Sequence, residues 1–220
     1  QGVQVTSLKL DDMEGINKLA NIKNSYAGIL GQEQVSYQNN LKKGMLFGIT
    51  SSYNEIDKGK VAQGRFFTDT EDRGLSQVVV LGSKMKEDLF GESDALGKEI
   101  KIKKKNFRVI GIMEKKGAMA FFDWDTMIYM PVRTLQKKIM GIDHVIYIMS
   151  QYKNKDQVGL TIKQIEALMR DNHNISDPEK DDFVVTSIEE AVKILETVTG
   201  AITLLLLALV GISLVVGGVG

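Results

Sequence analysis

The stretch QVVVLGSKMKEDLFGESDALGKEIKIKKKNFRVIGIM, residues 77–113, holds the clearest structural pattern in the chain. Its runs QVVVLG, KEIKIK and FRVIGIM are rich in β-branched residues and predict three short strands. Between the first two runs, Ser83 is expected to cap a short helix that Gly91 closes. Isoleucine and lysine alternate in KEIKIK, which is typical of a half-exposed sheet. The stretch therefore predicts a small, mostly β module.

The same pattern extends on both sides of this stretch. The run TMIYM, residues 126–130, predicts a further strand, and Pro131 suits the first turn of a helix that ends at Gly141. We therefore expect residues 58–141 to form a β-rich lobe.

Before the lobe, a strand, a helix and a second strand follow one another. Residues 2–10 predict the first strand, Asp11 is expected to cap the helix, and residues 26–37 predict the second strand. We expect residues 1–57 to form one βαβ unit.

The same order returns after the lobe. Residues 144–149 predict a strand, Asp156 is expected to cap a helix, and residues 182–186 predict the closing strand. Residues 142–187 would then form a second βαβ unit, and the two units predict an α+β domain into which the lobe is inserted.

The last part of the chain has a different composition. No charged residue occurs from Thr197 to Gly220, and a helix of that length rises about 36 Å, compared with about 30 Å for the hydrocarbon core of a bilayer. The alternative is a core helix of a soluble domain, but the contiguous leucines at 204–207 favour a transmembrane helix. The position at the C-terminal end excludes a signal peptide.

A capping box precedes this apolar run. In Ser187-Ile188-Glu189-Glu190, Ser187 is placed to accept a hydrogen bond from the amide of Glu190, whose carboxylate can reach back. Apolar residues then recur at steps of three and four, so residues 188–220 predict an amphipathic stalk helix that continues into the membrane. Within it, Ser213 and Gly217 form a small-xxx-small pair suited to close helix packing in lipid.

Composition excludes several classes of function. Lys and Arg total 28, as do Asp and Glu, so the basic excess of a nucleic-acid-binding protein is lacking. The absence of Cys excludes thiolate chemistry, and the two histidines, His144 and His173, lack the spacing of a zinc site. We expect a solvated polar loop around His173 and the acidic residues 177–182. We expect no catalytic residues, metal or cofactor, and we expect that the chain is not an enzyme.

One aromatic cluster is a candidate contact site. Phe121, Phe122 and Trp124 lie between two turn-like stretches, so they are expected on a loop where a partner or a substrate could contact them.

Residues 64–117 resemble the extracytoplasmic core of MacB-type ABC transporter permeases. The motifs G-R-F-F-T, V-V-L-G, L-F-G, L-G-x-x-I-x-I and F-x-V-I-G occur here in the order typical of that family. The matching positions are Gly64, Phe66, Phe67, Thr68, Val80, Leu81, Gly82, Leu89, Phe90, Gly91, Gly97, Ile102, Phe107, Val109, Ile110 and Gly111. Ala95 stands where the family often has Pro. The C-terminal apolar run resembles the family's second membrane helix.

This resemblance implies a fold, a location and partners. The fold would be a porter-like domain with an inserted β-rich lobe, outside the bacterial inner membrane and part of a longer permease. The expected partners are a cytoplasmic ABC ATPase domain or subunit, a second permease copy in a homodimer, a periplasmic adaptor protein and the membrane. The expected function is to transmit the ATPase cycle mechanically and so drive export of a drug or a peptide. The alternatives are a lipoprotein-releasing permease, an FtsX-like permease, and a membrane-anchored sensor without transport.

Overall fold

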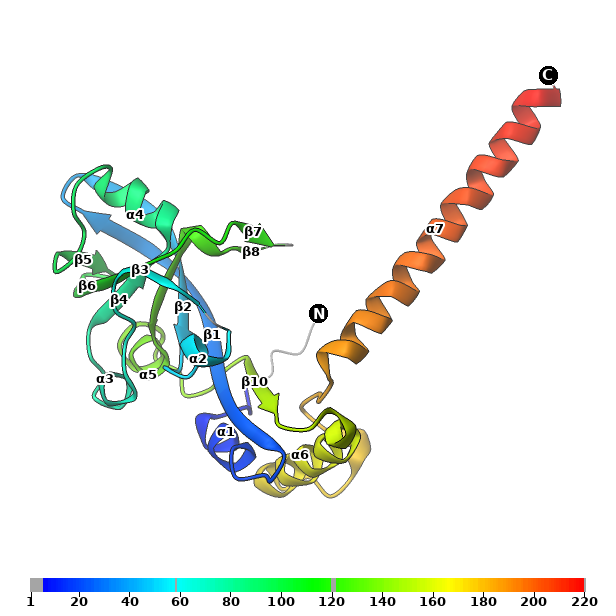
Figure 1. Ribbon diagram of the computed structural model, residues 1–220, viewed down its shortest axis with the longest axis horizontal. Coiled ribbons are helices and arrows are strands. Elements are labelled where there is room, and N and C mark those ends of the chain that lie inside the picture. The colour runs from blue at the N-terminus through cyan, green and yellow to red at the C-terminus, as the bar shows by residue number, and fades with distance from the viewer. Residues whose placement is uncertain (1–5, 58, 120–121, 220) are drawn as a thin grey trace.

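The computed structural model describes residues 6–57, 59–119 and 122–219 as a folded body and one long helix that leaves it (Figure 1). The strands are β1 Ile22–Tyr37, β2 Asn40–Ile49, β3 Val61–Gly64, β4 Val78–Leu81, β5 Glu99–Ile102, β6 Lys105–Met113, β7 Ala118–Met119, β8 Phe122–Asp123, β9 Met127–Pro131 and β10 Tyr147–Tyr152. The α-helices are α1 Leu10–Ile16, α2 Tyr53–Ile56, α3 Asp69–Arg73, α4 Ser83–Phe90, α5 Val132–Thr134, α6 Val158–His173 and α7 Ile188–Val219. Shorter turns are η1 Trp124–Thr126, η2 Leu135–Met140, η3 Lys155–Gln157 and η4 Pro178–Lys180, of which η2 is π-helical.

Most of the strands form one sheet that closes on itself. Its order is β10-β1-β2-β9-β4-β6-β3, with β2–β9 and β4–β6 parallel. The strand β5 pairs with β6 over its whole length and also with β1, at Val35–Ile102 and Ser36–Lys101. Because β5 bridges β1 and β6, the strands β1, β2, β9, β4, β6 and β5 form a closed ring, which leaves fewer free strand edges than an open sheet.

The main hydrophobic core fills this ring. In β5, Ile100 and Ile102 are fully buried, whereas Glu99 and Lys101 between them are exposed. Phe107 of β6, at 1% exposure, contributes an aromatic ring to the same cluster. Burying an aliphatic or aromatic side chain of this size contributes about 1.5–3 kcal/mol. The half-exposed strand predicted from the alternation in KEIKIK is therefore confirmed.

Two glycines of the family motifs are required where β3 pairs with β6. Gly64 and Gly111 face each other in the register of these strands, and Gly64 has a φ of 76°. A Cβ atom on Gly64 would collide with the carbonyl oxygen of Ile110, and one on Gly111 would collide with that of Arg65. Only glycine lets the two backbones approach this closely.

An aromatic cluster covers the other face of β1, β2 and β9. The rings of Tyr26 and Tyr53 meet edge to face at 5.2 Å, and Phe47 lies 5.7 Å from Tyr129. Tyr147 completes the cluster, because Gly28 leaves room for its ring. Burial is the main cause that raises the pKa of all four tyrosines, with a contribution from Asp57, so they stay neutral.

Most of the elements predicted for the lobe are confirmed. Strands form at all four predicted runs, and α4 ends at Gly91, which has a φ of 58°. Ser83 is the first residue of α4 and makes no capping hydrogen bond, since Gly82 holds the cap position. Pro131 precedes α5 as its cap residue, and Gly141 ends the π-helical turn with a φ of 72°.

The N-terminal unit needs two corrections. Residues 1–5 lie outside the described residues, and residues 6–9 form no strand. The helix α1 begins at Leu10 with Lys9 as its cap residue, so Asp11 is not the cap; Asp12 reaches back to the Lys9 amide instead. The strand predicted at 26–37 is confirmed and begins earlier, at Ile22.

The C-terminal unit also differs in part. The strand begins at Tyr147 instead of His144, and α6 is confirmed from Val158. Asp156 is not a cap: its amide donates to the side chain of Asn154, which caps η3. Residues 182–186 form no strand; Asp182 binds His173 at the end of α6 instead, and the chain then continues to α7.

The sheet is continuous between the predicted domain and the predicted lobe. β9 and β5, which belong to residues 58–141, pair directly with β2 and β1. One hydrophobic cluster includes both Met13 of α1 and Phe107 of β6. The boundaries at 57, 141 and 187 stay a prediction.

Candidate functional site: the neck before helix α7

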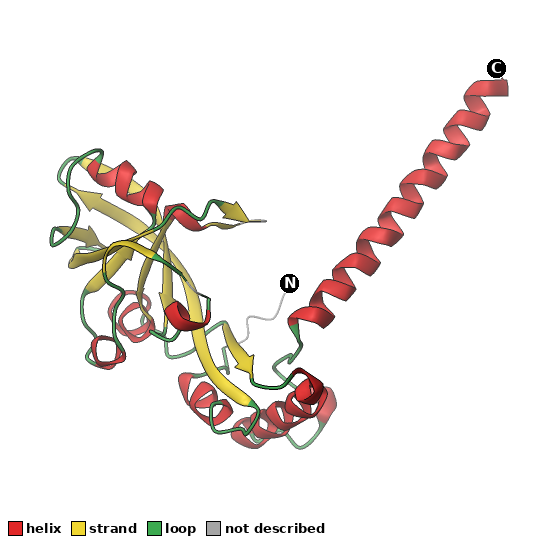
Figure 2. Ribbon diagram, viewed as in Figure 1, coloured by secondary structure: helices red, strands yellow, loops and turns green. Residues whose placement is uncertain are grey.

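The neck, residues 174–187, connects the folded body to α7, as Figure 2 shows. Among the described residues, α7 carries the one stretch, Ile188–Val210, that is long and apolar enough to cross a membrane by length and composition, with a mean hydropathy of 1.9. None of that stretch is buried against the body. The neck therefore decides how firmly a candidate membrane helix is fastened to the domain.

The N-terminus of α7 is capped from the neck. The amide of Glu190 donates to Ser187 Oγ at 3.1 Å, as the sequence pattern predicts. The carboxylate of Glu190 accepts a hydrogen bond from Thr186 Oγ1 at 3.4 Å, so it also holds the neck. Glu189 accepts from the Tyr152 hydroxyl at 3.1 Å and lies 3.7 Å from Lys155 Nζ. These exposed contacts join α7 to the end of β10, and each contributes little.

A nearly buried histidine clamps the neck to the body. The Nδ1 atom of His173, the last residue of α6, lies 2.8 Å from a carboxylate oxygen of Asp182, and its Nε2 atom lies 3.3 Å from Asp12 in α1. The side chains of His173 and Asp12 are only 8% and 6% exposed. We call these three residues the His173 clamp.

The geometry of the clamp favours a charged imidazole. A neutral imidazole has one N–H group, but two carboxylates face its two nitrogens, so both hydrogen bonds form only with the imidazolium. Burial lowers the pKa of His173, but the hydrogen bonds and charges of Asp182 and Asp12 outweigh it and raise the pKa overall. Burial raises the pKa of Asp182, but hydrogen bonding and the charge of His173 bring it below its usual value.

Asp12 is the fixed end of the clamp. Besides His173, it accepts hydrogen bonds from the Lys9 amide at 2.7 Å and from Asn172 Nδ2 at 2.8 Å. Three donors from α6 and from the start of α1 thus converge on one buried carboxylate. Its charge is compensated on every side, as a buried charge requires.

A second ion pair, at the residue before Asp182, reinforces the clamp. The guanidinium of Arg170 binds Asp181 through two nitrogens, with Nε 2.9 Å from Oδ1 and Nη2 2.7 Å from Oδ2. This two-nitrogen geometry is the strong form of the Arg–carboxylate pair. Phe183 follows and packs edge-on against the His173 ring at 6.0 Å. The residues 181–183 are thus the point where the neck is fastened.

The expectation of a solvated loop around His173 is therefore wrong. Instead, α6 continues as far as His173 and turns its side chain toward α1. The signal missed in the sequence was the pairing of Arg170 and His173 in the last helical turn with Asp181 and Asp182 beyond Pro178. Asp12 carried no signal, because its role depends on a contact across 161 positions.

The predicted aromatic contact site is only partly described. Phe121 lies outside the described residues, and so does the side chain of Phe122. Trp124 is half-buried on η1, where its ring lies 5.9 Å from Phe47 and under the amino group of Lys116 at 4.9 Å. Trp124 therefore packs on the aromatic cluster. The base of the β7–β8 hairpin is fixed nearby, because Asp125 accepts hydrogen bonds from the amides of Lys116 and Gly117.

The predicted packing pair lies far along α7. Ser213 is exposed, and its hydroxyl donates to the carbonyl of Leu209 at 2.9 Å. Gly217 belongs to the helix, but its surroundings are outside what the structure describes. Thr197 and Thr203 likewise donate to carbonyls four residues earlier, so these three hydroxyls are satisfied within α7 itself.

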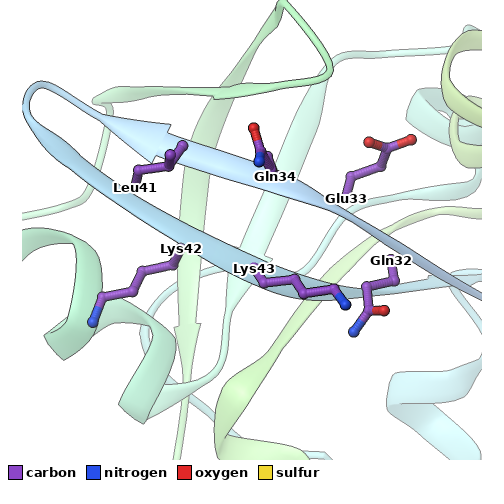
Figure 3. Close-up of a pocket in the computed structure, with 6 residues that line it drawn as sticks. All are labelled: Gln32, Glu33, Gln34, Leu41, Lys42 and Lys43. Carbon is purple, nitrogen blue, oxygen red and sulfur yellow. The ribbon is translucent and has the colours of Figure 1, made fainter.

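The body also carries a polar depression. A hollow of about 350 Å³ lies along the β1–β2 hairpin (Figure 3). Its lining residues are Gln32, Glu33, Gln34, Leu41, Lys42 and Lys43. Across the described residues, no group of three or more His, Cys, Asp and Glu side chains is arranged to hold a metal ion.

Solved structures define the class of protein that has this fold. The periplasmic region of MacB from Actinobacillus actinomycetemcomitans matches with a TM-score of 0.75 at 24% identity, over 87% of this chain and 84% of that one. The extracellular domain of the noncanonic ABC-type transporter YknZ from Gram-positive bacteria matches with a TM-score of 0.68 at 25% identity, over 77% and 86%. The fold is that of the extracytoplasmic domains of ABC-type transporters.

Sequence comparison narrows this class to one family. The family model of the MacB-like periplasmic core domain matches residues 2–168, and the chain belongs to that family. The macrolide export ATP-binding/permease protein MacB of Bdellovibrio bacteriovorus is 30% identical over 100% of this chain. Its counterpart in Neisseria meningitidis is 29% identical over 99%. The chain spans about a third of the length of these relatives, 34% and 33%.

Proposed function

We propose that this chain is the part of an ABC transporter permease that carries the ATPase cycle mechanically out of the membrane and so drives export. The observation that supports it most directly is the fastening of α7. A single helix of 32 residues, about 48 Å long, begins at a capped N-terminus next to the His173 clamp. A stiff helix whose first turn is held to the body can pass its motion to the body.

The partners in this proposal follow from the family. The two relatives are named ATP-binding/permease proteins, and about two thirds of their length lies outside the match. We therefore expect ATP hydrolysis in a separate domain or subunit, no cofactor in this chain, and an inner-membrane location with the body outside. We also expect a homodimer and a periplasmic adaptor. The export substrate is proposed to be a drug or a peptide.

A helix break in the complete protein tests the mechanical step. The double variant Val198→Pro/Ile202→Pro should break α7 near its middle, because each proline removes a backbone hydrogen bond and costs about 3 kcal/mol in a helix interior. We expect both substrate-stimulated ATP hydrolysis and export to fall at least tenfold. The matched variant Val198→Ala/Ile202→Ala keeps the helix and should retain both.

One result would refute the mechanical role of α7. If the proline variant reaches the membrane in normal amounts and still exports at the normal rate, the mechanical role of α7 is refuted. Purification of the complete protein with its ATPase tests the assignment to a transporter. Recovery without any ATPase domain or subunit would favour the membrane-anchored sensor.

A further inference from the structure

Six lysines gather at the end of the body that is farthest from α7. β5, β6 and the β1–β2 hairpin lie at this end, on the opposite side of the body from α7 in Figure 1. We call this group the basic tip, and its members are Lys42, Lys43, Lys101, Lys103, Lys104 and Lys105. All six are exposed.

The closed ring brings these residues together from two hairpins. The strand β1 lies between them, since Ser36 pairs with Leu41 of β2 on one side and with Lys101 of β5 on the other. Two residues further along the same strands, Lys43 of β2 pairs with Gln34 of β1. Two strand spacings of about 4.8 Å separate the hairpins, so the lysine backbones are about 10 Å apart across β1. That separation is close to the screening length at physiological salt, so the charges act on a ligand together.

Most of this charge has no partner in the body. Lys42 lies 3.8 Å from Asp88, and Lys103 lies 3.6 Å from Glu33 and donates to the Ile139 carbonyl. Among the described residues, the other four lysines form no ion pair. The chain as a whole has no net charge, so the tip is a local concentration of positive charge.

Two of these lysines, in the turn between β5 and β6, have an unfavourable backbone conformation. Lys103 and Lys104 have φ angles of 47° and 66°, in the left-handed region. A two-residue hairpin turn of this kind is normally formed by Asn-Gly, because a side chain with a Cβ atom is disfavoured there. Lysine at both positions weakens the turn and places two ammonium groups at the end of the ring.

The adjacent hollow adds amide and apolar side chains to the lysines of the tip. The depression along the β1–β2 hairpin is lined by two glutamines, Leu41 and the two lysines of β2, besides Glu33 (Figure 3). Amide side chains can bond to a peptide backbone, a leucine can contact an apolar side chain, and the lysines can pair with carboxylates. A free anion would need only the lysines, and neither the amide side chains nor the leucine.

We propose that the basic tip and this hollow bind an acidic, extended segment of a partner protein. The segment lies along the β1–β2 hairpin, with its carboxylates on Lys43, Lys101 and Lys104. The amide side chains and Leu41 of the hollow favour a peptide over a lipid headgroup, which would need only the lysines. The zero net charge argues against a nucleic acid.

A peptide-binding experiment on the complete protein in lipid nanodiscs tests this site. The probe is a fluorescent 15-residue peptide of alternating Glu and Ser, with a Gln–Ser peptide as its neutral counterpart. We expect the acidic peptide alone to bind, and the affinity to fall as NaCl is raised. The variant Lys43→Gln/Lys101→Gln/Lys104→Gln should weaken binding at least tenfold. The matched variant Lys18→Gln/Lys23→Gln/Lys163→Gln removes three exposed lysines elsewhere and should change it less than twofold.

The remaining outcomes overturn the proposal. Equal binding by the tip variant and the unmodified protein, or equal losses in both variants, would show that the tip is not the site. Tip-dependent binding to phosphatidylglycerol vesicles without binding to the acidic peptide would assign the tip to a lipid surface instead. The three lysines substituted in each variant are exposed, so neither variant is expected to unfold. Unchanged melting temperatures would verify this.

Discussion

The closed ring and the neck hold their residues in opposite ways. The ring is stabilised by apolar side chains that are fully buried, such as Ile100 and Val109. The neck is fastened by charged groups: His173 and Arg170 on α6 bind Asp182 and Asp181. Apolar burial involves no group that titrates, whereas ion pairs depend on pH and are weakened by the screening of salt. The body is therefore built to keep one shape, and its attachment to α7 is built from contacts that can open without unfolding the body.

The largest effect is expected in the ring. Phe107→Ala removes a ring that is 1% exposed and leaves a cavity, so the free energy of unfolding should fall by about 3–5 kcal/mol in urea titrations. Leu41→Ala, at a side chain that is 60% exposed, is the control and should change it by about 0.5 kcal/mol or less. Similar losses in both variants would mean that the ring interior is not the main core.

The next effect separates the neck from the ring. His173→Ala removes one partner of the buried Asp12 and releases Asp182, so local opening of the neck should become about 1–3 kcal/mol easier. Amide hydrogen exchange should speed up across the neck and leave the strands of the ring unchanged. The control is His144→Ala, at the chain's other histidine, which is half-buried. Uniform acceleration throughout the body would contradict the separation.

A smaller effect should follow pH. The pKa of His173 is raised in the folded state, so its stabilisation is complete below the ordinary histidine value of about 6.5 and is lost as pH rises through the folded value. The lowered pKa of Asp182 works in the other direction, and its stabilisation is lost as pH falls below about 4. Neck protection, corrected for intrinsic exchange rates, should therefore be greatest between about pH 4 and 6.5.

The variant His173→Gln is the control for this titration. It keeps a hydrogen-bonding side chain without a group that titrates in this range, so the fall in protection above about pH 6.5 should disappear. If the fall persists in the glutamine variant, another group is responsible for the pH dependence of the neck.

The smallest effect is expected at the start of α7. Tyr152→Phe removes the hydrogen bond to Glu189, in which Tyr152 is half-buried and Glu189 is exposed. A double-mutant cycle with Glu189→Gln should give a coupling of about 0.5 kcal/mol or less. A coupling above about 2 kcal/mol would show that exposed contacts, and not the clamp, fasten the helix.

The same contrast explains what could be predicted from the sequence. In the ring, alternation and turn residues act locally, so runs such as KEIKIK and FRVIGIM identified their strands. The closure of the ring was beyond prediction, because the contact of Val35 with Ile102 leaves no periodic signal in either segment. The cap at Ser187 is a local motif and could be predicted, whereas the clamp joins Asp12 to His173 across the whole body.

The local rule that predicted Asp11 as a cap failed. Lys9 is the cap residue of α1, and Asp12 reaches back to its amide while it also meets His173 and Asn172. The role of Asp12 thus depends on tertiary contacts that a local pattern does not contain. The resemblance to MacB-type permeases, carried by the motifs of residues 64–117, is confirmed by the family match.

The length of β1 has a consequence for how the chain folds during synthesis. Its first half pairs with β10, and its last residues pair with β2 and β5. A ribosome has therefore made β1 and β2 long before Tyr147–Tyr152 can complete the sheet, and pairing over such sequence separations is slow. Until then one edge of β1 is open to wrong partners. Soon after β10 emerges, the apolar part of α7 follows, so the sheet can close only shortly before the last helix is made.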